Sequence, residues 1–236
     1  MGHTPENVFR NFLDDADVHV IGNARGEYNS VVLLKSSSGK YVLRKKQKPV
    51  QIDLSAVAYE MEFMDRLRES QSVLHVPRNI PPKNGALLFE DTDAFYNLQT
   101  RVPGINRFKA WYDTTALTFD DIGEIFSSLA VVHDASRFFQ MTNKKIGRTE
   151  GAFMREFGEK LRDQTIPDGP FKNCFSQHRE FLLDHIRSLQ KILHEVGYNE
   201  REIYPAHYDL NVCNMLWLGG KVSSIVDFLV RDAVIL

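Results

Sequence analysis

The sequence predicts an α+β fold in two parts, a first region of strands with one prominent helix and a second region made mainly of helices. Up to the Pro103-Gly104 pair, apolar side chains come in short runs that are typical of β-strands. Beyond that pair, the apolar residues recur with the period of an α-helix. A pair of glycines between two late strand-like runs indicates a hairpin within the helical part. We therefore expect two domains, residues 1–103 and residues 104–236.

Length, composition and charge exclude several classes of protein. The 236 residues are 43% hydrophobic and 25% charged, which is typical of a globular chain rather than a disordered one. A net charge of −2 argues against a nucleic-acid partner. The apolar runs are too short to cross a membrane, and the N-terminus lacks the pattern of a secretory signal. Two cysteines are too few for a disulfide framework or a zinc site, so we expect a cytoplasmic protein with no membrane partner.

The first region is expected to form a five-stranded antiparallel sheet with helices. Thr4 followed by Pro5 is typical of a helix start. The strand-like runs are residues 18–22, 28–35, 41–46, 86–90 and 95–101. Residues 53–70 predict a helix whose inward stripe is Leu54, Val57, Met61, Met64 and Leu67. Prolines break the segment 75–85, which is expected to be a loop.

The second region is expected to contain two long helices and a hairpin. Thr118 is a suitable cap for a helix that runs to about Asp134. Its expected inward residues are Ile122, Ile125, Phe126, Leu129 and Val132. A second helix is expected over 177–196. The Gly219-Gly220 pair predicts the turn of the hairpin.

A set of acid and amide side chains follows this second helix. Asp209 is followed five residues later by Asn214, and Asp227 comes thirteen residues after that, beyond the hairpin. Phosphoryl transfer needs one carboxylate that orients and deprotonates the attacking hydroxyl, and oxygen ligands that hold Mg²⁺ against the phosphates. A hairpin between Asn214 and Asp227 brings two such ligands together. The spacing therefore indicates a phosphoryl-transfer site.

The stretch HYDLNVCN, followed by IVDF, resembles motifs of the aminoglycoside phosphotransferase and choline kinase family. These small-molecule kinases have a protein-kinase-like bilobal fold, and Tyr208 stands where protein kinases have an arginine. The resemblance implies that Asp209 is the catalytic base and that Asn214 and Asp227 are the Mg²⁺ ligands. It assigns His207 to structural support of the loop.

The first region resembles the same family. The run that begins GEYN looks like its nucleotide loop, in which Gly26 allows close approach to phosphate and Asn29 offers donors. The run YVLRKK looks like the strand with the phosphate-binding cation, which aligns best with Arg44. Lys45 is the alternative, and because the two neighbours point to opposite faces of a strand, only one can reach the cleft. Lys46 and Lys48 are interpreted as solvated charges.

Two arguments select Glu60 as the partner of this cation. On a helical wheel, Glu60 lies at the edge of the inward stripe, three residues after Val57 and four before Met64. The family spacing of a glutamate and a leucine seven residues later also selects Glu60, with Leu67. The order of nucleotide loop, cation strand, helix glutamate, catalytic loop and VDF is shared with the family over about residues 15–228.

The end of the chain departs from the family pattern. After VDF the chain continues LVRDAVIL, without the family's Gly-Asp-Pro stretch and the usual later helices. Their absence is expected to expose apolar surface on the helices at 118–134 and 177–196. The apolar C-terminal region could pack against a second copy and form a homo-oligomer.

We therefore expect an enzyme that uses ATP and Mg²⁺ to phosphorylate a hydroxyl group of a small molecule. The acceptor is expected to be an aminoglycoside, choline or a similar amine or sugar. The alternative is a catalytically incomplete, kinase-like protein that binds a nucleotide or a partner. Binding of Mg·ATP without any turnover distinguishes the alternative from the enzyme.

Overall fold

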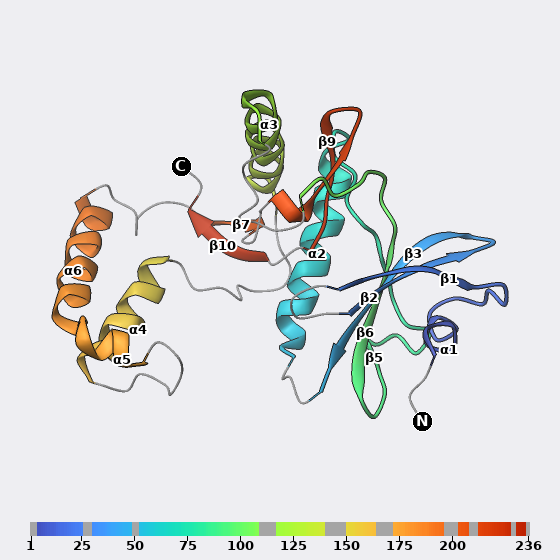
Figure 1. The fold of residues 1–236 in the computed structure, drawn as a ribbon, viewed down its shortest axis with the longest axis horizontal. Coiled ribbons are helices and arrows are strands. Elements are labelled where there is room, and N and C mark those ends of the chain that lie inside the picture. Colours follow the sequence, from blue (N-terminus) through green and yellow to red (C-terminus); the bar gives the residue numbers. More distant parts are fainter. Residues whose placement is uncertain are drawn as a thin grey trace. The chain divides into compact units, whose positions relative to one another are not determined.

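The computed structural model divides into two compact units (Figure 1). The first consists of residues 1–144 and 207–230, and the second of residues 145–206 and 231–236. The residues described are 4–25, 30–48, 52–108, 117–139, 150–163, 172–195, 203–207, 212–227 and 230–234. Within these ranges, no helix has both the length and the apolar content needed to span a bilayer. The domain boundary expected after residue 103 stays a prediction.

The first unit is built on an antiparallel sheet with the strand order β1-β2-β3-β6-β4, in which β5 also pairs with β6. Its strands are β1 (His19–Arg25), β2 (Ser30–Ser36), β3 (Gly39–Gln47), β4 (Asn79–Ile80), β5 (Phe89–Glu90) and β6 (Ala94–Thr100). All five expected strands are present, and the predicted α+β class is confirmed. The extra strand, β4, lies in the segment predicted as a loop. A pairing of two residues is too short to leave a periodic pattern in the sequence.

An apolar core closes one face of this sheet. The helix α1 (Pro5–Phe9) starts as predicted, because the Thr4 side chain accepts a hydrogen bond from the Asn7 amide. The Phe9 ring packs edge-on against Tyr41, with centroids 5.3 Å apart. The buried cluster consists of Val8, Phe9, Phe12, Val18, Leu34, Tyr41, Leu43, Ala94, Tyr96 and Leu98. Because side chains alternate along a strand, this core directs the intervening residues of β3 and β6 to the opposite face.

The helix α2 (Leu54–Ser70) carries the side chains that meet this opposite face. Its cap is Asp53, whose carboxylate accepts hydrogen bonds from two amides of the first turn. Its buried residues are Tyr59, Phe63, Met64 and Leu67. The prediction that Leu54 faces inward is wrong, since this side chain is 52% exposed. The two aromatic residues shift the buried face around the helix, which leaves Leu54 outside it and brings Glu60 onto it.

The predicted hairpin is formed by β8 (Met215–Leu218) and β9 (Lys221–Ile225). Gly219 and Gly220 adopt positive φ values of 61° and 80°, as its tight turn requires. The chain after β6 is attached to this hairpin, because Ile105 and Trp217 exchange backbone hydrogen bonds of 3.0 and 2.8 Å. A side chain at Gly104 would place its Cβ only 2.6 Å from the Ser223 hydroxyl, so the close approach requires glycine.

The helix α3 (Phe119–Ser136) begins at the predicted cap, Thr118, which forms a capping box with Asp121. The predicted inward face is wrong in part. Val132 is buried, but Ile122 is exposed and Phe126 is 63% exposed. Small residues form much of the face that contacts α2 and β9, so the larger apolar side chains lie elsewhere on the helix. Phe126 and Ile122 thus contribute to the exposed apolar surface that was also expected for this helix.

The second unit contains three described helices, α4 (Glu150–Arg162), α5 (Lys172–Gln177) and α6 (Arg179–Glu195). It also contains most of the paired strands β7 (Ile203–His207) and β10 (Val230–Val234). The Arg179 guanidinium joins α6 to the end of α4 by donating hydrogen bonds of 2.8 and 2.6 Å to the carbonyl groups of Leu161 and Arg162. Of these helices, only α6 corresponds to a predicted one.

Candidate active site

Arg44 and Lys45 point to opposite faces of the sheet. The Lys45 ammonium lies 5.8 Å from the centre of the Tyr96 ring, which belongs to the α1-side core. Arg44 instead reaches toward α2 and contacts the carboxylates of Glu60 and Asp227. The structure therefore places Arg44, and not Lys45, among the predicted site residues.

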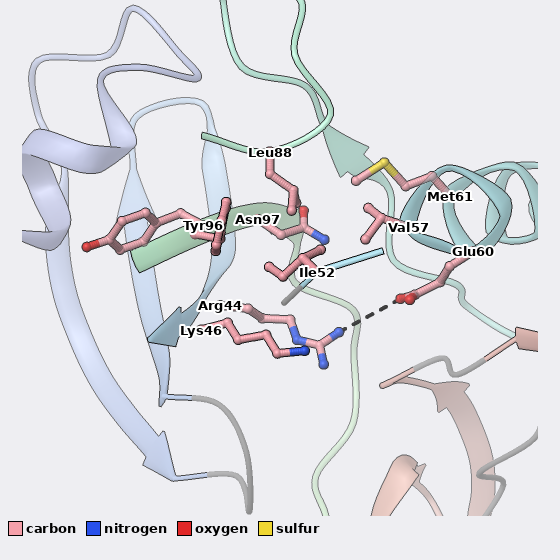
Figure 2. A pocket seen from close by; sticks show the side chains of 10 residues that line it. Arg44, Lys46, Ile52, Val57, Glu60, Met61, Leu88, Tyr96 and Asn97 are labelled. Carbon is pink, nitrogen blue, oxygen red and sulfur yellow. Dashed lines mark ion pairs between the residues drawn. The ribbon is translucent and has the colours of Figure 1, made fainter. Parts of the chain in front are cut away.

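Glu60 faces Arg44 from α2, as Figure 2 shows. An oxygen of Glu60 (Oε1) is 4.0 Å from Nη1 of Arg44, and the side chains are 23% and 19% exposed. Burial raises the pKa of Glu60 from 4.5 to about 7, while Arg44 acts in the opposite direction and Asp227 adds to the rise. At neutral pH the carboxyl group is therefore close to the midpoint of its titration.

Asp227 is bonded to Arg44 through its carboxylate oxygen Oδ1 and the guanidinium Nη2. Its side chain is 50% exposed, so solvent and ions can reach the carboxylate. Its φ of 56° is positive, which among the described residues is otherwise seen only at glycines. This left-handed conformation is unfavourable by about 1 kcal/mol or more for a side chain with a Cβ, and such strain is concentrated at functional sites.

The hairpin brings Asn214 and Asp227 to its base. The Val226 amide donates a 2.9 Å hydrogen bond to the Asn214 carbonyl, one residue outside the paired strands. The carbonyl of Val226 lies 3.2 Å from Nε2 of the buried His207. His207 therefore links the start of the predicted catalytic loop to the residue before Asp227. This contact agrees with the supporting role that the sequence suggests for His207.

The predicted metal ligands have the chemistry that Mg²⁺ requires. Asp227 offers an accessible carboxylate, and the buried Asn214 carries an amide group directly before the facing strand, at the base of the same hairpin. Mg²⁺ commonly takes only one or two carboxylates from a protein and completes its shell with phosphate oxygens and water. The described part of the chain holds no group of three His, Cys, Asp or Glu side chains that could form a metal site without a nucleotide. The residues present thus fit a metal that arrives with phosphates.

Three predicted site residues lie outside the described residues. They are Gly26 and Asn29 of the expected nucleotide loop and the expected base, Asp209. Of the remaining four, Arg44, Glu60 and Asp227 are brought together directly, and Asn214 lies at the base of the same hairpin as Asp227.

One charged residue near the site has a different environment from the one predicted. Lys46 is half-buried and lines a cavity between the sheet and α2, although it was interpreted as a solvated charge. The alternation of side chains along β3 contains the signal, because Lys46 and Arg44 share a face. Lys48, in contrast, pairs with Glu90 at 2.6 Å.

The sequence matches the model of the Phosphotransferase enzyme family over residues 19–230. The chain belongs to this family. The match includes the Arg44 strand, α2 and the hairpin up to Asp227, which confirms the predicted family. No curated protein sequence matches the chain.

Solved structures share the fold of this phosphotransferase family member at low sequence identity. An aminoglycoside phosphotransferase from Alicyclobacillus acidocaldarius is 15% identical, with a TM-score of 0.58 over 99% of this chain and 68% of that one. A microcompartment-associated aminopropanol kinase is 16% identical, with a TM-score of 0.60 over 97% and 69%. The amicoumacin kinase hAmiN, in complex with AMP-PNP, Ca²⁺ and Ami, is 15% identical, with a TM-score of 0.58 over 92% and 60%.

These similarities confirm the kinase-like fold. The chain spans between 60 and 69% of the length of the three solved structures.

Proposed function

We propose that this phosphotransferase transfers the γ-phosphate of ATP to a hydroxyl group of a small molecule. The observation that carries the proposal is the position of Arg44, which contacts Asp227 and lies 4.0 Å from Glu60. These three side chains come from a strand, a helix and the base of a hairpin, so the fold assembles them from distant parts of the sequence. A guanidinium in this position can exchange a carboxylate for phosphate oxygens, which it binds with the same geometry.

In the proposed complex, residues 1–103 bind the nucleotide and residues 104–236 supply the catalytic loop and the acceptor site. Arg44 holds the α- and β-phosphates, and Glu60 fixes the orientation of its guanidinium. Gly26 and Asn29 approach the phosphates from the nucleotide loop. When phosphate oxygens replace Asp227 beside Arg44, the Asp227 carboxylate becomes available to bind a metal ion.

Asn214 and Asp227 are the residues proposed to hold Mg²⁺. When bound, the ion supplies positive charge that neutralises the phosphates during transfer. The backbone hydrogen bond between Val226 and Asn214 keeps the two ligand residues side by side at the base of the hairpin.

Asp209 is the proposed base. It orients the acceptor hydroxyl and receives its proton as the oxygen attacks the γ-phosphorus atom. His207, two residues earlier, is anchored to the carbonyl of Val226. Transfer breaks the bond between the γ-phosphorus and the β–γ bridging oxygen, and ADP leaves.

The acceptor that we propose is an alcohol that also carries amine or sugar groups. The similar structures include an aminoglycoside phosphotransferase and an aminopropanol kinase, which suggests this class. A thermal-shift screen of amino alcohols, aminoglycosides and choline, with Mg·ADP present, will identify candidates because only ligands of the folded protein raise its melting temperature.

Asp209→Asn tests the proposed chemistry. Removing a general base typically slows turnover by about 10²- to 10⁴-fold, so we expect a loss in this range with the best acceptor. The affinity for Mg·ATP, measured by calorimetry, should change less than about twofold, because the base does not hold the nucleotide. Asp134→Asn is the control, since Asp134 is an exposed residue of α3.

Two results would contradict the proposal. If Asp209→Asn keeps near-normal turnover, the assignment of the base is wrong. If the unmodified protein binds Mg·ATP but phosphorylates no acceptor of the panel and hydrolyses no ATP, the non-catalytic alternative is correct.

A further inference from the structure

A cavity of about 130 Å³ lies between the sheet and α2, and Arg44 and Glu60 of the candidate active site border it. Its apolar wall comes from three parts of the first unit. Val57 and Met61 contribute from α2, Ile52 from the segment before α2, and Leu88 and Phe95 from the region of β5 and β6. The close-up in Figure 2 shows Val57, Met61 and Leu88 around one side of this space. An apolar side of this kind favours a hydrophobic group over water.

The charged side of the cavity consists of Arg44 and Lys46 on β3 and of Glu60 on α2. Lys46 and Arg44 extend beside each other from the strand toward α2, as Figure 2 shows. Arg44 is already engaged by Glu60 and Asp227. Lys46 is half-buried and forms no ion pair with any described residue. The charge of Lys46 lowers the pKa of the Glu60 carboxyl group, but Glu60 already faces Arg44. The two cations of β3 therefore exceed the charge of the one carboxyl group that lines the cavity, and a second anion beside Lys46 would be stabilised.

The dimensions of the cavity limit the size of the ligand. An apolar cavity of about 150 Å³ accommodates a benzene ring, so a volume of 130 Å³ accommodates a hydrophobic group of about that size. A larger group such as a purine nucleoside would extend out of the cavity. The space therefore suits a compact hydrophobic body whose charged end lies near Lys46.

We propose that this cavity binds a small amphipathic carboxylate, with its hydrophobic body against Val57, Met61 and Leu88 and its carboxylate paired with Lys46. Arg44 and Glu60 border this site, but the carboxylate pairs with Lys46 and leaves the contacts of Arg44 with Glu60 and Asp227 in place. Because Arg44 lines the same cavity, occupation of the site and binding of a nucleotide are thermodynamically coupled, each changing the affinity of the other by the same factor. The binding of the carboxylate itself does not depend on the proposed phosphotransfer.

Benzoate is the probe, titrated into the full-length protein by calorimetry and by ligand-observed NMR. We expect saturable binding to one site and much weaker binding of benzyl alcohol, which has a similar shape without the charge. Lys46→Met should weaken benzoate binding by about tenfold or more, as expected for the loss of a charge-assisted pair. Lys45→Met is the matched control, because this neighbouring lysine points to the opposite face, and it should leave the affinity within about twofold.

A titration in saturating Mg·ADP separates this site from the nucleotide site. Benzoate should still bind, with an affinity that reaches a plateau as ADP increases. The proposal is overturned if benzoate does not saturate, if Lys46→Met binds it as well as the unmodified protein, or if ADP displaces it completely. Leu88→Trp provides a second route if Lys46→Met does not fold, because it fills the cavity and leaves Lys46 in place. Unchanged benzoate binding in the folded Leu88→Trp variant would also overturn the proposal.

Discussion

The two faces of the N-terminal sheet are built from the same strands and have opposite character. On the α1 side, Leu43 and Leu98 are fully enclosed in an apolar cluster. On the α2 side, the neighbouring residues on the same strands are Arg44 and Asn97, which line a cavity. One face is closed by hydrophobic packing, and the other combines polar side chains with a cavity.

The polar groups on the α2 side are connected to one another. The side-chain oxygen of Asn79 accepts hydrogen bonds from Asn97 and from the buried Gln99, at 3.3 and 2.9 Å. A buried amide contributes less to stability than a packed apolar side chain, even when its hydrogen bonds are made. We therefore expect substitutions in the apolar cluster of the α1 side to lower stability more than substitutions of the polar groups on the α2 side, which are suited to binding.

Phe9→Ala tests whether the α1 side carries the stability. Phe9 is fully buried, and truncation of a buried phenylalanine typically costs about 3–5 kcal/mol because it leaves a cavity. We expect the free energy of unfolding, measured by urea denaturation, to fall by this amount. The affinity of the remaining folded protein for Mg·ATP should stay within about twofold.

Phe119→Ala is the control for this substitution, because Phe119 is exposed and should lower stability by less than about 0.5 kcal/mol. Equal losses for the two variants would show that burial in the α1-side cluster adds little to stability. A large loss of ATP affinity in folded Phe9→Ala would show that the two faces are not separable.

Glu60→Gln tests whether the α2 side contains a buried carboxyl group whose charged form lowers the stability of the folded protein. The folded pKa of Glu60, about 7, lies above its ordinary value of 4.5, so the folded state holds the proton more tightly. The stability due to this group is therefore complete below pH 4.5 and is lost as the pH rises through about 7. By linkage, the loss amounts to at most about 3 kcal/mol.

Unfolding curves at a series of pH values check this expectation. Between pH 4.5 and 7.5, the stability of Glu60→Gln relative to the unmodified protein should rise by up to about 3 kcal/mol. Glu69→Gln, at an exposed position of the same helix, removes the same charge and serves as the control. A pH dependence that Glu60→Gln leaves unaltered would show that this carboxyl group is not held in a buried, charge-disfavouring position.

The sequence predicts those features that depend on local pattern. The runs of β2, β3 and β6 and the Gly219-Gly220 turn each contain their own signal, so the sheet and the hairpin could be anticipated. The alternation of side chains along a strand likewise predicts that Arg44 and Lys45 face opposite sides of the sheet. The helical position of Glu60 could be judged in the same way, because it depends only on its neighbours along α2.

Other features depend on partners far away in the sequence. Arg44 and Asp227 are 183 residues apart, and no local pattern indicates that they pair. The inward face of α3 was mispredicted at Phe126 because its packing against α2 and β9 is made largely by small residues. Similarly, the cavity beside Lys46 results from the meeting of α2, β3 and β6, so the lysine alone could not reveal it.

Lys45→Met and Arg44→Met compare the two faces at adjacent positions of one strand. The Lys45 ammonium lies 5.8 Å from the Tyr96 ring, a cation–π contact worth about 0.5–1 kcal/mol at a partly exposed site. Lys45→Met should lower the free energy of unfolding by no more than this and leave the affinity for Mg·ATP within about twofold. Arg44→Met should weaken Mg·ATP binding by about tenfold or more, because charge-assisted contacts to phosphate are lost. The reverse pattern in calorimetric titrations would assign the phosphate contact to Lys45, and Arg44 would then serve only to join α2 to the hairpin.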